Sequence, residues 1–126
     1  MPDKDLLTPA QCDLETIAQI AHEAIRALCS AYEQEAQPPW HDAPDWMHEA
    51  SFSGVEFRIN NPGGTPHAQH QQWMDKKRED GWVYGAIKDS DAKTHPLLIP
   101  YEDLPEIEKR KDALLAAVVS AMMDPI

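Results

Sequence analysis

The chain is poor in cysteine, in basic residues and in long apolar runs, and each shortage excludes a class of protein. It has two cysteines among its 126 residues, Cys12 and Cys29. Both fall in one predicted helix, where a rise of about 1.5 Å per residue separates them by roughly 25 Å, far beyond disulfide reach. We therefore expect reduced thiols in a reducing compartment.

Basic residues are few: the chain has 11 lysines and arginines and 22 acidic residues, so its net charge is −11. This balance argues against DNA or RNA as a partner, because such binding depends on neutralising phosphates. Residues 76–93 are the exception, because this window contains five basic residues and four acidic ones. If a small anion binds anywhere, it binds near this window; a solvated helix end with mixed charges is the alternative explanation.

Apolar runs are too short to span a bilayer, and the first five residues lack the basic start and apolar block of a signal peptide. We therefore expect a soluble protein of the cytoplasm with no membrane partner. The length suits a single domain, and an apolar content of 42% suits a globular fold.

Apolar spacing and helix-start signals predict a mainly α fold, a small single domain of about three helices with short extended or β segments and long ordered loops. We expect a flexible lead over residues 1–8 and the domain over residues 9–126. Thr8 and Pro9 suit the start of a helix that continues to about residue 34. Its apolar stripe has seven members: Leu14, Ile17, Ala18, Ala21, Ile25, Leu28 and Tyr32.

The next segment carries aromatic side chains among prolines and acids, which predicts an ordered loop over residues 38–53 pinned by those rings. Val55, Phe57 and Ile59 alternate with polar residues, so a short strand or extended edge follows. The turn-forming residues 60–64 end it.

Thr65 and Pro66 predict the start of a second helix, which runs to about Asp80 with Gly81 just beyond its end. The segment after it is expected to be irregular, with one short β pairing.

A third helix follows a cap at Asp103, with Glu106 three positions on, and ends near Met123.

Catalytic, metal and cofactor motifs are missing. His67 and His70 form a His-x-x-His pair without a further ligand at suitable spacing, so we expect no metal site. No nucleophile elbow or zinc-protease motif occurs, and we predict neither catalytic residues nor a cofactor. Residues 62–66 lead into a helix N-terminus, which suits either an anion or a simple connector.

Aromatic rings and imidazoles gather in the C-terminal half of the chain. A flat indole beside cationic side chains suits a stacked nucleobase with its phosphates on lysine or arginine. Packing in a hydrophobic core explains the same rings, and both roles are compatible. The ring-bearing residues are His70, Trp73, Trp82, Tyr84, His95 and Tyr101.

These residues follow a rare order that resembles the ryanodine-receptor repeat (RyR) domain. The similarity covers about residues 66–121. The matching positions are His70, Trp73, Lys76, Lys77, Gly81, Trp82, Tyr84, Gly85, Lys93, His95, Pro96, Pro100, Tyr101, Leu104, Pro105, Lys111 and Asp112. Residues 21–23, 39–40, 43–46 and 54–57 are similar to the stand-alone, single-repeat version of bacteriophages and bacteria.

The resemblance implies a small, mostly helical domain without enzymatic activity. Paired repeats in the animal channels are associated with adenine-nucleotide binding, and prokaryotic members have been proposed to sense nucleotide-derived signals in immunity. A single repeat implies that a two-repeat cleft needs a homodimer or higher homo-oligomer.

The resulting hypothesis is a non-enzymatic module for a small nucleotide-like ligand, for example a phage anti-defence protein that captures a host signalling nucleotide in the host cytoplasm. Trp73 stacks the base, and Trp82 and Tyr84 form the wall. The remaining predicted ligand-binding residues are Lys77, Arg78, Lys88, Lys93, His95, Tyr101 and His70. A structural or protein-interaction module without a small ligand is the alternative.

Overall fold

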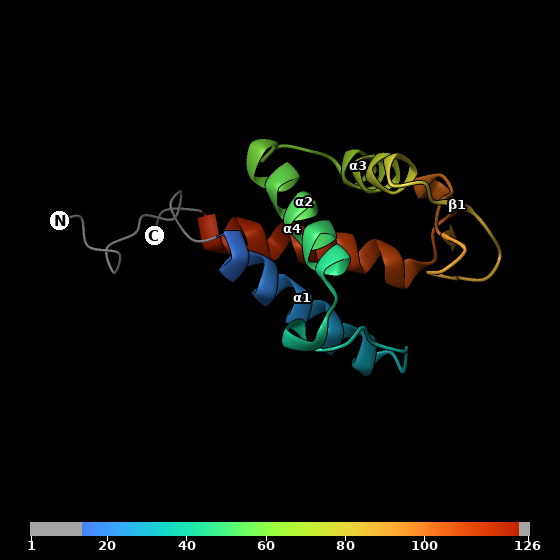
Figure 1. The fold of residues 1–126 in the computed structure, drawn as a ribbon. Helices are drawn as coiled ribbons and strands as arrows, with labels where there is room; N and C mark the ends of the chain where they lie inside the picture. Colours follow the sequence, from blue (N-terminus) through green and yellow to red (C-terminus); the bar gives the residue numbers. More distant parts are fainter. Residues whose placement is uncertain (1–13, 124–126) are drawn as a thin grey trace.

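Four α-helices make up most of residues 14–123, the part of the chain that this computed structural model describes (Figure 1). The predicted mainly α class is confirmed. In chain order the elements are α1 (Leu14–Ala31), the 3-10 turn η3 (Trp40–Asp42), α2 (Asp45–Asn60), α3 (Pro66–Glu79), β1 (Val83–Tyr84), β2 (Thr94–His95), the 3-10 turn η4 (Tyr101–Asp103) and α4 (Glu106–Met123).

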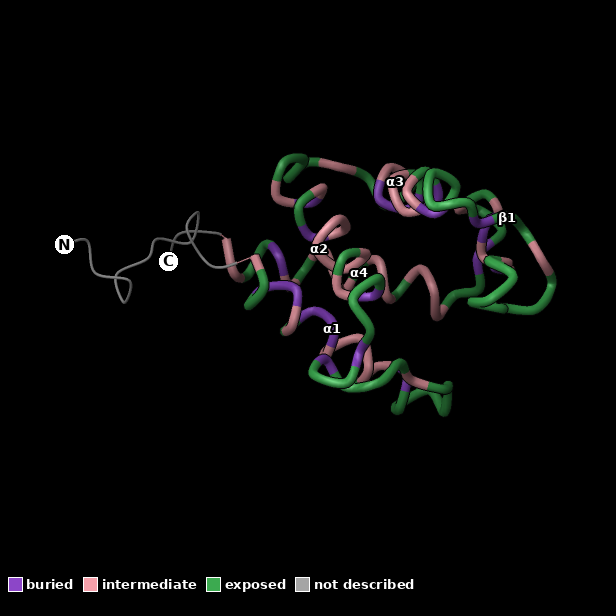
Figure 2. The backbone as a smooth tube through the Cα atoms, in the orientation of Figure 1, coloured by how far each residue is buried: buried purple, intermediate pink, exposed green. Residues whose placement is uncertain are grey.

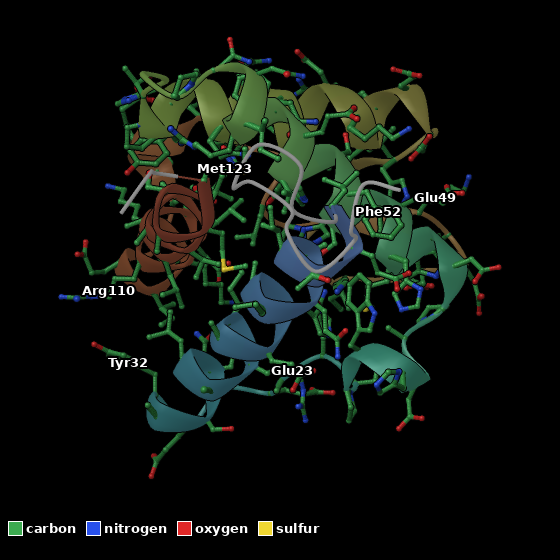
Figure 3. All side chains as sticks on the ribbon, turned by 90° about the vertical axis from the view of Figure 1, so that its left-hand side faces the viewer. Glu23, Tyr32, Glu49, Phe52, Arg110 and Met123 are labelled. Atoms are coloured by element: carbon green, nitrogen blue, oxygen red, sulfur yellow. The ribbon has the colours of Figure 1, made fainter. Side chains whose placement is uncertain are left out.

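Helix α1 packs against α4 and α2 through the apolar stripe predicted for it. Ile17, Ala18 and Ala21 are buried, because they recur on one face of the helix. The helix ends at Ala31, so Tyr32 lies beyond it and is half exposed; the side chain extends away from the core (Figure 3). The predicted cap at residues 8–9 and the lead before it lie outside the described residues.

Helix α2 corrects the sequence prediction, which placed a loop and a short strand over the same residues. The alternation of Val55, Phe57 and Ile59 spans too few residues to distinguish a strand from one helix turn. Met47, Val55 and Arg58 are the buried residues of α2, at steps of eight and three that suit a helix face.

The predicted aromatic anchor before α2 is confirmed at Trp40, which is buried and stacks on His48 with ring centroids 4.1 Å apart. The Trp40 amide donates to the Glu23 carboxylate over 2.9 Å, and this bond together with Arg26 lowers the pKa of Glu23. Glu23 therefore attaches the η3 turn to α1 (Figure 3).

A buried arginine attaches α2 to α3. Arg58 donates to the Gln69 side-chain oxygen over 3.1 Å and to the Gly64 carbonyl over 2.7 Å, and Gln69 in turn donates to the Gly54 carbonyl. These bonds give partners to two guanidinium nitrogens, Nε and Nη1, of a residue that is only 6% exposed.

Helix α3 begins and ends as its sequence signals predict. The Thr65 hydroxyl accepts a hydrogen bond from the Ala68 amide, and Pro66 occupies the first turn. At the other end Gly81 has a φ of +92°, which a residue without a Cβ adopts freely. The Trp82 amide returns to the Lys77 carbonyl over 2.9 Å, so the chain reverses into β1.

The predicted short β pairing is confirmed as a two-stranded parallel contact between β1 and β2. It lies where α3 ends and α4 begins (Figure 1). Asp103 does not cap α4, contrary to the prediction: it belongs to η4, and α4 begins at Glu106 after Pro105. The predicted end near Met123 is confirmed.

Two apolar clusters hold the described residues together, and buried stretches recur on each helix (Figure 2). The larger joins α1, η3, α2 and α4 through Ile17, Ala18, Trp40, Val55 and Val119. The smaller joins α3 to the following segment through Met74, Trp82 and Leu98. Within residues 14–123, no helix combines the length and apolarity needed to cross a membrane.

Candidate functional site

Two adjoining cavities lie between the helices, each of about 470 Å³. Cavity 1 is bordered by residues of all four helices and of the segment after α3, including Trp46, Gln69, Gln72, Trp73, Lys77, Trp82, Lys93 and Asp112. Cavity 2 is bordered by His70, Trp73, Lys88, His95 and Asp112, among others. The residues common to both are Ile25, Trp73, Lys111 and Asp112.

Trp73 is half-buried and forms part of the wall of both cavities. The His70 ring stacks on it at 5.5 Å between centroids, and the His95 ring meets it edge-on at 4.9 Å. Both imidazoles border cavity 2 and neither borders cavity 1. The other rings that border cavity 1, those of Trp46 and Trp82, make no ring contact with Trp73 in the described part of the chain.

Lys77 is the buried cation of cavity 1, only 8% exposed. Its Nζ lies 4.8 Å from the centroid of the Trp46 ring and 4.4 Å from that of Trp82. Burial lowers the pKa of Lys77 to about 8, with a further contribution from Lys88, while the charge of Asp80 and the two indole faces favour the ammonium form.

The Lys77 ammonium has no hydrogen bond or ion pair with any residue in the described part of the chain, and it is not fully enclosed. Since Lys77 borders cavity 1, an anion placed there gains a donor that no protein group competes for.

The other lysines of cavity 1 are already engaged. Lys93 donates to the Asp80 carbonyl over 2.7 Å, and Lys76 approaches the Asp80 carboxylate at 3.7 Å. Lys111 pairs with Glu108 at 3.1 Å. Each of these ammonium groups therefore already has a protein partner, and each adds positive potential around the cavity.

Asp112 faces both cavities from α4. Burial raises the pKa of its carboxyl to about 6, and the neighbouring charge of Glu108 adds to this, while Arg58 and Lys111 oppose it. The nearby Lys111 ammonium is paired with Glu108 instead, so the Asp112 carboxyl makes no hydrogen bond with a described residue.

The histidines beside Trp73 are positioned by backbone groups. A ring nitrogen of His70 lies 2.7 Å from the Ile99 carbonyl, which makes that nitrogen the donor. His95 Nδ1 accepts from the Leu97 amide over 3.1 Å, and burial and nearby lysines lower the pKa of His95 to about 4. His95 is therefore neutral at pH 7 and presents an N–H rather than a charge.

Three predicted ligand-binding residues lie outside both cavities. Tyr84 is 60% exposed on β1, so it does not form a wall with Trp82. Tyr101 packs on His67, with ring centroids 4.3 Å apart, and carries the Lys109 ammonium over its ring. Arg78 is exposed and contacts Met74.

His67 and His70 have separate partners, since His67 pairs with Glu102 at 3.0 Å while His70 holds the Ile99 carbonyl. No group of three or more candidate metal ligands occurs among residues 14–123. At the loop before α3, the Gly64 amide bonds the Asn61 carbonyl and Arg58 bonds the Gly64 carbonyl, as suits a connector.

Sequence reasoning missed the wall that comes from α2 and α4. The sequence pattern places Trp46 in a loop, and it includes Asp112 in the family motif but not among the ligand-binding residues. Residues 45–60 carry little amphipathic pattern, so no apolar period in the sequence indicated that Trp46 lies on a helix. Gln69 and Gln72 of α3 also border cavity 1.

The family model described as "RyR domain" matches residues 66–123, which comprise α3, the β pairing and α4. The predicted similarity to this family is confirmed, with nearly the same boundaries. Helices α1 and α2 precede the matched region and pack against it. The chain therefore carries a RyR domain at residues 66–123.

Proposed function

We propose that this chain is a non-enzymatic module that binds a small nucleotide-derived anion in cavity 1. The observation that supports it most strongly is the pairing, in one cavity, of an indole that the cavity's other rings do not contact and a buried ammonium that makes no hydrogen bond or ion pair with a described residue. Trp73 receives the base, and Lys77 receives a phosphate.

The size and lining of cavity 1 suit such a ligand. Ligand pockets are typically about 300–1,000 Å³, mostly apolar, with a few well-placed polar groups. Three indoles, from Trp46, Trp73 and Trp82, provide apolar walls, and stacking of one base on an aromatic ring contributes about 1–3 kcal/mol. The Gln72 amide nitrogen already donates to Ser53 Oγ over 2.8 Å, and its side-chain oxygen adds an acceptor for a base edge.

The biological setting belongs to the same proposal. In this proposal the chain is a stand-alone repeat of the phage and bacterial kind. It sequesters or senses a host signalling nucleotide in the host cytoplasm. Cavity 1 draws its walls from a single chain, so a ligand of this size binds without a partner subunit, and homo-oligomer formation is an addition to the site rather than a requirement.

A thermal-shift screen with mono-, di- and cyclic nucleotides tests the proposal, because a ligand of the folded state raises the melting temperature. The Lys77→Met variant keeps the length of the side chain and removes its charge. We expect it to weaken binding about tenfold or more, as for the loss of a charge-assisted hydrogen bond. Its matched control is Arg78→Met, on the next residue of α3 but outside both cavities.

Two outcomes contradict the proposal. One is a complete panel that leaves the melting temperature unchanged. The other is an equal loss of affinity in Lys77→Met and Arg78→Met, which would mean that only the general charge of α3 matters.

A protein-interaction module is the second candidate, and one observation favours it. Val83, Tyr84 and Ile87 are 58%, 60% and 79% exposed on the segment after α3, an apolar surface that a protein partner could cover. Multi-angle light scattering of the wild type and of a Tyr84→Ser, Ile87→Ser variant tests for self-association there. A monomer in both, over a wide concentration range, excludes self-association through this surface.

A further inference from the structure

Cavity 1 holds a second group without a hydrogen-bond partner among the described residues, of opposite charge to Lys77. Asp112 projects from α4, borders both cavities and makes no hydrogen bond with a described residue. The two groups also do not pair with each other, since no ion pair joins them. The cavity therefore presents a cation and an acceptor at separate positions.

The acceptor restricts what can fill the cavity. A ligand that fills the cavity keeps water away from the Asp112 carboxylate. A buried carboxylate left without a donor carries a large desolvation penalty, whereas a hydrogen bond to a charged group is among the stronger ones. A phosphate near Asp112 adds repulsion, which Glu108 strengthens.

We propose that Asp112 accepts hydrogen bonds from neutral O–H or N–H groups of the ligand, so that cavity 1 selects nucleotides with such donors over purely phosphate anions. This inference rests on the proposed function, because it concerns the same cavity. Trp73 and Asp112 border both cavities whereas Lys77 borders cavity 1 alone, so we place the donors on the nucleoside part of the ligand, toward the stacked base. Lys77 takes the anionic end.

Two parts of a ribonucleotide carry the required donors. The ribose 2′- and 3′-hydroxyls offer a pair that one carboxylate accepts together, and the amine of adenine offers an N–H. Isothermal titration with AMP and ADP, their 2′,3′-dideoxy forms, the inosine counterparts and pyrophosphate distinguishes these sources. We expect pyrophosphate to bind at least about tenfold more weakly than ADP.

The dideoxy or the inosine series should lose about ten- to hundredfold in affinity for the wild type, and Asp112→Ala should lose as much for AMP and ADP. In Asp112→Ala the discrimination between the series should disappear. Asp112→Asn retains one acceptor oxygen and should lie between. Asp103→Asn, an exposed residue outside both cavities, is the control for net charge and should bind as the wild type does.

The inference is wrong if the wild type binds pyrophosphate as tightly as ADP, or binds all nucleotide series alike. It is also wrong if none of these probes binds. In the first two cases nucleotide binding in cavity 1 still stands, and only the selection of donor groups by Asp112 is lost. If no nucleotide of the thermal-shift panel binds, the proposed function and this inference are both wrong. The comparison of ligands on the wild type decides the matter even if Asp112→Ala does not fold.

Discussion

At the scale of single residues, two neighbours on α3 show how helix geometry decides a role. Lys77 and Arg78 are adjacent in sequence, yet successive residues of a helix point about 100° apart. Lys77 turns inward between two indoles, and Arg78 turns to solvent. Trp73 and Lys77 are four residues apart and do share a face, as their spacing predicts, since both border cavity 1.

The charge of Asp112 should destabilise the folded protein at neutral pH. The folded-state pKa of about 6 is above the ordinary 3.8, so the protonated form is the one that folding favours. That stability is fully present below pH 3.8 and is lost as the pH rises through 6. Asp112→Asn, which mimics the neutral form, should therefore raise the free energy of unfolding by about 1–3 kcal/mol at pH 7.5 and have little effect at pH 4.

Urea unfolding at both pH values measures this difference, with Asp103→Asn as the exposed control. A loss of stability in Asp112→Asn at pH 7.5 would show that the carboxylate is held by a favourable partner, and the cavity account of this residue would then be wrong.

At the scale of elements, local signals in the sequence correctly predicted the ends of α3, whereas a short alternation of apolar and polar residues wrongly predicted a strand within α2. Both ends of α3 were predicted because a cap, a proline and a glycine act on the residues next to them. Helix α2 was not, since it has little amphipathic pattern and several of its contacts are polar, including those of Arg58 and His48. A buried arginine on a helix face gives no apolar signal in the sequence.

The β pairing depends on a glycine at the end of β1. A Cβ on Gly85 would lie 2.6 Å from Thr94 Cβ, so β1 and β2 would have to separate. We expect Gly85→Ala to lower the free energy of unfolding by about 1–3 kcal/mol, as for an overpacked contact. Gly63 is the control, because nothing lies within 4 Å of an added Cβ there.

Urea unfolding of the two variants checks the prediction. Equal stability of Gly85→Ala and Gly63→Ala would show that β1 and β2 do not pack closely at this position.

At the scale of the whole molecule, the RyR domain and the helices before it share one core and one site. Val119 of α4 packs with Ile17 of α1 and Val55 of α2, and Trp46 of α2 faces Trp82 with ring centroids 6.2 Å apart. The family pattern indicated Trp73 and Lys77 from the sequence. It could not indicate that Trp46 and Asp112 join them, because those contacts depend on how α2 and α4 pack on α3.

The most direct test of the account is isothermal titration of the nucleotide with the largest thermal shift into the wild type, Trp73→Leu and Tyr84→Leu. We expect one ligand per chain, at least about fivefold weaker binding in Trp73→Leu from lost stacking, and unchanged binding in Tyr84→Leu. Equal affinity of wild type and folded Trp73→Leu would contradict the account, since the ligand would then bind away from this indole.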